Sequence, residues 1–191
     1  MPADRNNGDQ LLYFSPGFVG PRSKAGEAAA EPASAPSDVP SADPWQSAPD
    51  LPDAVMDNVA DSYNGKVYSA FGDAGLSIGG DTTSKNLYVL DPAAGAWTKL
   101  AAAADSRQAP GHGIIDGKLY AAGGWGSDGT ADGKLEIYYI ATGTWSTGAP
   151  EPRPYAGAGS AVAGGKLYLI GGCDTTCGTT DASVYDPATD S

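Results

Sequence analysis

Short apolar runs bounded by glycine-rich turns dominate the chain after residue 44. Three of them share one arrangement, at 64–68, 116–120 and 164–168, in which a two-residue turn and a lysine precede an apolar run that contains a tyrosine. Runs of this length, rich in Val, Ile, Leu and Tyr and bounded by Gly, Asn and Asp, are typical of β-strands. No stretch shows the periodicity of a long amphipathic helix, so the pattern predicts an all-β protein.

The runs recur at a nearly fixed interval. The lysines that begin them are 52 and 48 residues apart, and Trp45, Trp97 and Trp145 keep the same two intervals. A fixed period near fifty residues is the signature of a repeat architecture. The chain therefore contains three structural units in register with one another.

Each unit is expected to hold four short strands, except the last. The predicted runs are 54–62, 66–72, 86–91 and 96–100 in the first unit and 110–115, 118–124, 135–140 and 144–147 in the second. In the third unit, 157–163, 166–172 and 182–186 are followed only by a few residues, because the sequence stops at Ser191. The third unit is therefore expected to lack its last strand.

These units closely resemble the kelch repeat. The kelch pattern has a tight turn, a strand that ends in a glycine pair, a variable loop, a Tyr-Asp-Pro-like turn and a tryptophan. The resemblance covers residues 45–191, about three-quarters of the chain. The residues that carry it are the glycine pairs Gly123-Gly124 and Gly171-Gly172, the turns Asp91-Pro92 and Asp186-Pro187, and the tryptophans Trp45, Trp97 and Trp145.

Two positions depart from the kelch pattern. Phe71-Gly72 stands where the first unit should have a glycine pair, so a distorted strand end is expected there. Tyr139-Ile140 replaces the Asp-Pro turn of the second unit, although Gly143 and Trp145 keep the register. Neither change conflicts with the repeat.

The resemblance implies a partial kelch β-propeller of about three four-stranded antiparallel blades, the last incomplete. The blades are expected at about 45–100, 101–147 and 148–191. A propeller needs about 4 to 8 blades to close its ring, so the remaining blades of a longer chain are an expected partner. Because the terminal blades would expose apolar faces and strand edges, the three-blade piece is not expected to fold stably by itself.

The first 44 residues have a different composition. Residues 1–19 are read as the tail of a preceding domain or as disordered. Residues 20–44 are rich in Ala, Pro and Ser with one β-branched residue, Val39, so they predict a linker that cannot bury enough apolar area to order itself.

Charge and hydropathy exclude several kinds of partner. The formal net charge is −12, which argues against nucleic acid because binding to phosphates needs a basic patch. No run approaches the roughly 20 apolar residues needed to cross a bilayer, so no membrane partner is expected. The first residues also lack the basic and apolar regions of a signal peptide.

Two cysteines, Cys173 and Cys177, lie four residues apart in the variable loop of the third unit. A zinc site would need two further ligands, and none lies nearby in the sequence. A local disulfide is the favoured interpretation, and two free thiols are the alternative. A disulfide would indicate an oxidising, extracellular setting, so secretion is expected.

Other motifs that suggest chemistry have simpler explanations. Residues 75–79 match the G-x-S-x-G nucleophile pattern, but they lie in a loop and the chain has a single histidine, His112. His112 is expected on an inner strand as a structural residue. Residues 128–133 resemble a calcium loop without its third and last ligands and are read as a hairpin turn. No catalytic residue, metal site or cofactor is therefore expected.

The expected functional surface follows from strand direction. In antiparallel blades, the loops between the second and third strands emerge at the same end as the connections between blades. The polar and aromatic residues expected there are Asp105, Arg107, Trp125, Asp128, Arg153 and Tyr155. An exposed tryptophan together with two arginines is typical of recognition surfaces. The alternative is that Arg107 and Arg153 brace neighbouring blades.

The sequence favours a non-catalytic binding module that presents its loops to a protein, peptide or glycan. The order of linker, acidic kelch repeats and cysteine loop is similar to the C-terminal part of secreted bacterial subtilisin-type serine peptidases, which implies an accessory region of a larger protein. One alternative is part of a catalytic kelch propeller, an oxidase or sugar epimerase whose active-site residues lie in other blades. A cytoplasmic kelch adaptor with reduced thiols is a further alternative.

Overall fold

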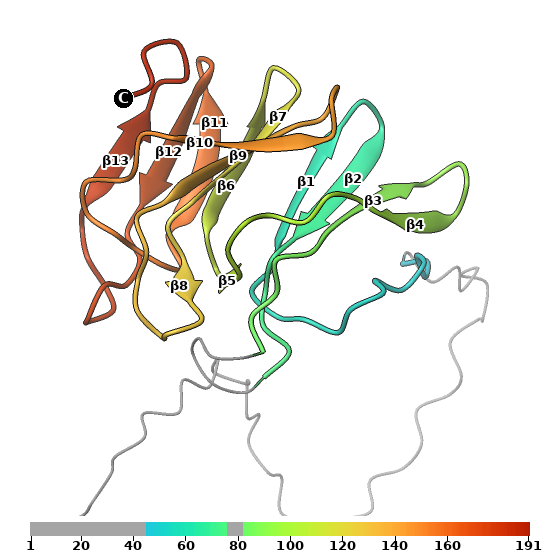
Figure 1. Cartoon of the computed structure of the whole chain (residues 1–191), viewed down its shortest axis with the longest axis horizontal. Coiled ribbons are helices and arrows are strands. Elements are labelled where there is room, and N and C mark those ends of the chain that lie inside the picture. Colours follow the sequence, from blue (N-terminus) through green and yellow to red (C-terminus); the bar gives the residue numbers. More distant parts are fainter. Residues whose placement is uncertain (1–44, 76–81) are drawn as a thin grey trace, which may run out of the picture. The chain divides into compact units, whose positions relative to one another are not determined.

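The strands of the computed structural model, which describes residues 45–75 and 82–191, assemble into three antiparallel sheets of three or four strands and one small two-stranded ribbon (Figure 1). The tail at 1–19, the linker at 20–44 and most of the motif at 75–79 lie outside the described residues. Within the described part, no helix is long and apolar enough to cross a bilayer.

Each sheet corresponds to one predicted unit. The first has the order β1 (Val59–Tyr63), β2 (Lys66–Ala70), β3 (Leu87–Asp91) and β4 (Ala96–Lys99). The second contains β6 (Gly111–Ile115), β7 (Lys118–Ala122), β9 (Leu135–Tyr139) and β10 (Thr144–Gly148), and the third β11 (Gly159–Ala163), β12 (Lys166–Ile170) and β13 (Ala182–Tyr185). This arrangement confirms a partial propeller whose last blade has three strands. We call the sheets blades 1, 2 and 3.

The blades stack face to face through two apolar clusters. Between blades 1 and 2, the core contains Tyr68 and Leu87 from blade 1 with Leu119 and Tyr138 from blade 2. A second cluster joins blade 2 to Leu167 and other residues of blade 3. The first strand of blade 2, β6, contacts both β1 and β11. The first strands of the three blades thus lie side by side, as expected for the innermost strands of a propeller.

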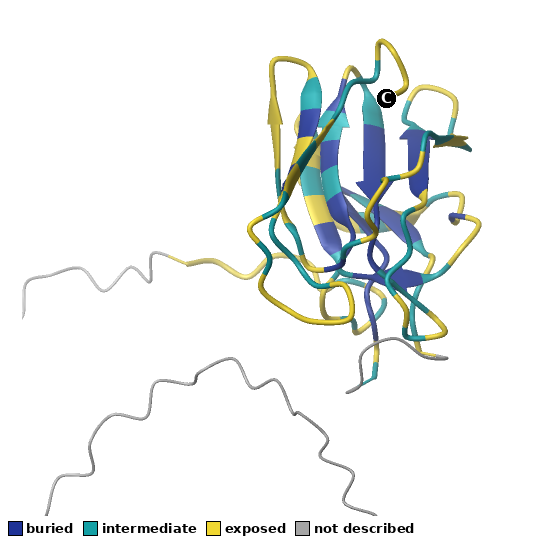
Figure 2. Ribbon diagram, turned by 90° about the vertical axis from the view of Figure 1, so that its left-hand side faces the viewer, coloured by how far each residue is buried: buried dark blue, intermediate teal, exposed yellow. Residues whose placement is uncertain are grey.

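The outer face of blade 3 is exposed. Tyr168, Ile170 and Val184 are 36%, 57% and 50% exposed, and exposed residues alternate with buried ones along β12 (Figure 2). By strand register, the residues of blade 2 at these positions are Tyr120, Ala122 and Ile137, which blade 3 covers almost completely. Blade 3 therefore presents the type of face that blades 1 and 2 bury against a neighbour.

Two tryptophans tie the last strand of a blade to the segment that enters it. The indole Nε1 of Trp97 donates to the Pro49 carbonyl at 2.9 Å, and that of Trp145 donates to the Ala101 carbonyl at 2.8 Å. The regular spacing of Trp97 and Trp145 therefore corresponds to the same indole–carbonyl hydrogen bond in blades 1 and 2. Trp45 lies outside the strands and is 85% exposed.

The glycine pair sets the end of the second strand in each blade. Its first position has φ of 63° at Phe71, 68° at Gly123 and 70° at Gly171. Blade 1 therefore follows the same path as the other two, and the expected distortion at Phe71 is absent. A phenylalanine is accepted in this unfavourable conformation because its ring is buried and packs edge-on against Trp145, with centroids 5.9 Å apart.

The strands are shorter than predicted at the ends near the glycine pairs. For example, β1 begins at Val59 rather than at residue 54, and β7 ends at Ala122 rather than at 124. The chain leaves each sheet at the glycine pair and forms separate pairs beyond it. In blade 2 these pairs make a small ribbon of β5 (Arg107–Gln108) and β8 (Trp125–Gly126), which the sequence did not predict.

Candidate binding surface

The loops between the second and third strands and the connections that enter each blade gather at one end of the sheets, which we call the loop end (Figure 1). At this end every blade repeats the same backbone pairing among three segments. The entering segment pairs with the residue after the glycine pair, which pairs in turn with the returning loop. The bridges are Met56 with Asp73 and Asp73 with Thr83 in blade 1, Gln108 with Trp125 and Trp125 with Ala131 in blade 2, and Ala156 with Cys173 and Cys173 with Cys177 in blade 3.

The second glycine of each pair allows these segments to approach one another. Gly124 has φ of 98°, and a Cβ there would lie 2.8 Å from the Gln108 carbonyl oxygen. Gly72 and Gly172 have similar φ values and similarly close carbonyl contacts. The loop end is therefore a rigid frame of paired backbone rather than a set of independent loops.

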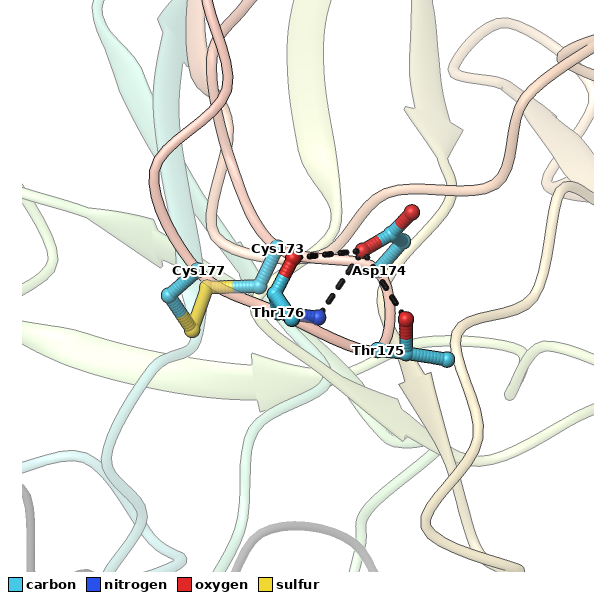
Figure 3. Close-up of a disulfide and its surroundings, with 5 residues drawn as sticks. All are labelled: Cys173, Asp174, Thr175, Thr176 and Cys177. Carbon is cyan, nitrogen blue, oxygen red and sulfur yellow. Dashed lines mark hydrogen bonds between the residues drawn. A yellow bond between two sulfur atoms is a disulfide. The ribbon is translucent and has the colours of Figure 1, made fainter.

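The expected disulfide is present between Cys173 and Cys177 (Figure 3). Cys173 occupies the position that Trp125 holds in blade 2, so the covalent bond closes the returning loop where the other blades use only a backbone bridge. Inside the loop, the Asp174 carboxylate accepts a hydrogen bond from the Thr176 backbone N–H at 2.9 Å (Figure 3). The shortest of the three loops is thus also the most constrained.

Arg107 lies in the interior rather than on the exposed surface expected for it. Its side chain is 1% exposed and forms a salt bridge with Glu136 at 2.5 Å. Its Nη1 donates to the carbonyl oxygens of Gly123 and Lys134, both at 3.0 Å, and its guanidinium lies over the Phe71 ring of blade 1. These contacts favour the bracing interpretation for Arg107 over direct contact with a ligand.

A polar hollow of about 430 Å³ lies between the loops of blades 1 and 2. Asp105 and Lys134 form a salt bridge across it at 2.7 Å, and Lys134 also lies 3.5 Å from Asp132. The Lys134 ammonium lowers the pKa of Asp105, so this pair is charged at neutral pH. The residues that line the polar hollow are Thr83, Lys85, Ala104, Asp105, Ser106, Gly126, Ser127, Asp128, Asp132 and Lys134.

Two predicted residues lie at or beside the polar hollow. Asp128 is exposed and accepts hydrogen bonds from the backbone N–H and the hydroxyl of Thr130, at 3.0 and 2.8 Å, which lower its pKa. The predicted hairpin turn, rather than a calcium loop, accounts for these bonds. Trp125 is half-buried at the base of the same loop, where it pairs with Gln108.

The other two predicted residues, Arg153 and Tyr155, meet at blade 3. Both donate to the same oxygen, Asp181 Oδ2, at 2.6 Å from Arg153 and 2.5 Å from Tyr155. They line a second cavity of about 260 Å³, which also includes Glu151, Pro152, Leu169, Gly171, Asp181, Ala182 and Ser183. The structure therefore splits the predicted surface into two places, the polar hollow and this cavity, which we call the Glu151 cavity.

Asp181 was not singled out from the sequence, although the repeat contains a signal for it. In each blade a side chain of the entering segment bonds to the residue just before the third strand. The pairs are Asp53 with Asn86 at 2.6 Å, Asp105 with Lys134 at 2.7 Å, and Arg153 with Asp181 at 2.6 Å. The residue types differ among the three blades, but the bond between these two positions is present in each. The Arg153–Asp181 bond therefore also helps to hold blade 3 together.

Glu151 is the second residue that sequence reasoning missed. The Ser183 hydroxyl donates to its Oε1 at 2.9 Å, while Oε2 is buried with no hydrogen-bond partner among residues 45–75 and 82–191. Burial raises the pKa of Glu151 and outweighs the opposing effects of the Ser183 hydroxyl and the Tyr155 backbone N–H. Because burial favours the neutral form of Glu151, a cation beside it would lower its pKa and stabilise the charged carboxylate.

The residues considered for catalysis or metal binding do not form a reactive group in the described part of the chain. His112 is half-buried on β6. Among residues 45–75 and 82–191, no three His, Cys, Asp or Glu side chains are grouped so that they could hold a metal ion. The surface chemistry at the loop end consists of charged pairs, hydroxyls and backbone groups.

Comparison with known proteins agrees with this arrangement. A family model for the kelch motif matches residues 106–150 and 154–191, which contain blades 2 and 3. The solved structure of YjhT is similar over 66% of this chain and 37% of that chain, with a TM-score of 0.56 and 29% sequence identity. The sheets of blades 2 and 3 therefore carry the kelch motif. Blade 1 lies before the matched residues, yet it has the same strand order and loop-end bridges.

Several curated relatives that match part of the chain are named as kelch proteins. An F-box/kelch-repeat protein of Arabidopsis thaliana is 32% identical over 89 residues, which cover 47% of this chain and 24% of that protein. Kelch-like protein 33 of Homo sapiens is 33% identical over 99 residues, which cover 51% and 18%. Beta-scruin of Limulus polyphemus is 26% identical over 134 residues, which cover 65% and 15%. The chain thus spans 15–24% of the length of these relatives.

Proposed function

We propose that this chain is a non-catalytic binding module that presents the loop end of its kelch blades to a protein, peptide or glycan. Kelch repeats generally mediate interactions with other proteins. The observation that carries the proposal is the polar hollow, in which charged side chains and hydroxyls from two blades face a shared space. Because the repeated backbone bridges fix its loops, little conformational entropy is lost when a ligand binds there.

Removing two carboxylates from the polar hollow is expected to weaken ligand binding about tenfold or more, since a charge-assisted hydrogen bond contributes about 1.5–3 kcal/mol. The variant is Asp128→Asn with Asp132→Asn. An asparagine keeps the Oδ1 acceptor that each aspartate offers to its own loop, at Thr130 and Lys134, and loses only the charge. Ligands selected from a phage-displayed library of random peptides and from a glycan array serve as probes, and calorimetry gives the affinities.

The matched control is Asp116→Asn, which removes an exposed carboxylate from the turn between β6 and β7, at the opposite end of the sheets. Asparagine tolerates the φ of 47° at this position. Affinities that fall in the double variant and stay unchanged in the control support the polar hollow as the binding surface. Selected ligands that bind all three proteins equally well would contradict it.

We also propose that the module belongs to a larger secreted protein, such as a subtilisin-type serine peptidase, with a further blade covering blade 3. The Cys173–Cys177 disulfide supports secretion because such bonds persist in oxidising compartments. The apolar face with Tyr168, Ile170 and Val184 supports a covering blade, because the matching face of blade 2 is buried against blade 3.

The coding DNA on both sides of this segment tests the proposed parent protein. We expect a tryptophan and further repeats in frame downstream, and a signal peptide with a catalytic domain upstream. A reading frame that holds neither would refute both the covering blade and the secreted parent. The binding role of the polar hollow would be unaffected by that result.

A further inference from the structure

The carboxylates at the two interfaces between blades differ in their hydrogen bonds. Between blades 1 and 2, Glu136 has both oxygens satisfied, since Oε1 accepts from the Ala104 backbone N–H at 2.8 Å and Oε2 accepts from Arg107. At blade 3, one Glu151 oxygen is bonded to the Ser183 hydroxyl and the other has no hydrogen-bond partner in the described part of the chain. The second interface therefore holds a carboxylate without a guanidinium.

The repeat shows that both carboxylates lie in equivalent surroundings. Backbone pairing places Ser183 of blade 3 at the position of Glu136. The bond from Gly124 N–H to the Tyr155 carbonyl repeats that from Gly72 N–H to the Arg107 carbonyl, so Tyr155 holds the position of Arg107. Glu151 lies in the entering segment, and it bonds to Ser183, the residue at the position of Glu136. Both carboxylates therefore lie at or beside the same position of the third strand.

The acceptors that hold the Arg107 guanidinium also have counterparts in the Glu151 cavity. In blade 2 they are the carbonyl oxygens of Gly123 and Lys134. Gly171 and Asp181 occupy these two positions in blade 3, joined by the same backbone bond from the glycine N–H, and both line the cavity. The position of Arg107 is taken by Tyr155, whose hydroxyl bonds to Asp181.

From this correspondence we propose that the Glu151 cavity binds a guanidinium group, that of an arginine side chain on a partner polypeptide. The cavity is separate from the polar hollow, and the proposal stands whether or not the polar hollow binds a ligand. Its charge suits a monocation, since Glu151 and Asp181 supply two negative charges and Arg153 supplies one positive charge. The planar guanidinium can reach a carboxylate and backbone carbonyls at once, which a lysine ammonium cannot do with the same geometry.

The direct test titrates the protein with its remaining blades present, using N-acetyl-arginine amide and, as the matched probe, N-acetyl-lysine amide. The arginine compound is expected to bind at least about tenfold more tightly, because it supplies more than one directed hydrogen bond. Glu151→Gln keeps the size and the Oε1 acceptor and is expected to weaken arginine binding at least about tenfold. Asp116→Asn, in the turn between β6 and β7 at the opposite end of the sheets, is expected to leave this affinity unchanged.

A second variant tests the same site by placing a guanidinium of the chain itself in the Glu151 cavity. Tyr155→Arg places a guanidinium at the position that Arg107 holds in blade 2. It is expected to block N-acetyl-arginine amide and to raise the thermal midpoint, and adding Glu151→Gln should remove that gain. Equal binding of the arginine and lysine compounds, or equal arginine binding by wild type and Glu151→Gln with both folded by near-ultraviolet circular dichroism, would overturn the proposal.

Discussion

Replacing Arg107 by methionine is expected to destabilise the chain by about 3–5 kcal/mol, because it leaves a buried carboxylate without its partner. The Glu136 side chain is 3% exposed, and its Oε2 accepts a hydrogen bond from the Arg107 guanidinium. The carbonyl oxygens of Gly123 and Lys134 lose a donor in the same step. Urea unfolding followed by tryptophan fluorescence measures the loss.

Two further variants separate the buried charge from the loss of packing. In the double variant Arg107→Met with Glu136→Gln, no charge remains unpaired, so most of the lost stability is expected to return. Arg153→Met removes an exposed pair, since the Arg153 side chain is 73% exposed, and should cost less than about 1 kcal/mol. A loss at Arg107 no larger than the loss at Arg153 would show that the buried pair does not brace the blades.

The architecture was predictable because it depends on features that repeat. The turn, strand and tryptophan of each unit recur at one spacing, and each recurrence corresponds to the same contact, such as the indole bond to Pro49 or Ala101. The number of blades and the absence of a fourth strand in blade 3 follow directly from that spacing. The spacing was sufficient for the number of units, and the resemblance to the kelch repeat implied their arrangement as blades.

The side-chain environment was less predictable, because it depends on which neighbouring blade faces each residue. Arg107 and Arg153 both precede a first strand and carry the same charge, yet one is buried and the other is exposed. The difference arises from partners distant in sequence. Glu136 receives Arg107 in the interior, whereas Asp181 holds Arg153 at the surface.

Aligning the units on their lysines would have revealed part of the missing information. Such an alignment places Asp53, Asp105 and Arg153 of the entering segments in one column, 13 residues before each lysine. Asn86, Lys134 and Asp181 lie 20, 16 and 15 residues after the lysines, so they form a column only when the units are also aligned on the start of the third strand. The pairing of these columns marks Asp181 as a partner of Arg153. It does not reveal Glu151, because the matching residue of blade 2 is Ala103, and only the folded interface shows the carboxylate against Ser183.

Replacing Gly123 by alanine is expected to cost about 3 kcal/mol or more, because it combines an unfavourable backbone conformation with a steric clash. Its φ is 68°, and a Cβ would lie 2.2 Å from the backbone carbonyl oxygen of Tyr155. That oxygen accepts the Gly124 N–H at 2.9 Å, so it cannot move away without breaking a bond between blades 2 and 3. Urea unfolding measures the change.

The same position in the other blades provides the control for this clash. Gly171 has nearly the same φ, 70°, but a Cβ there would lie 3.5 Å from its nearest neighbour, the Thr179 carbonyl oxygen. Gly171→Ala should therefore cost only the backbone term, about 1–2 kcal/mol. Blade 1 already tolerates phenylalanine at this position, with φ of 63°. If the two alanine variants lose equal stability, backbone conformation alone explains the glycine, and close contact between blades 2 and 3 does not.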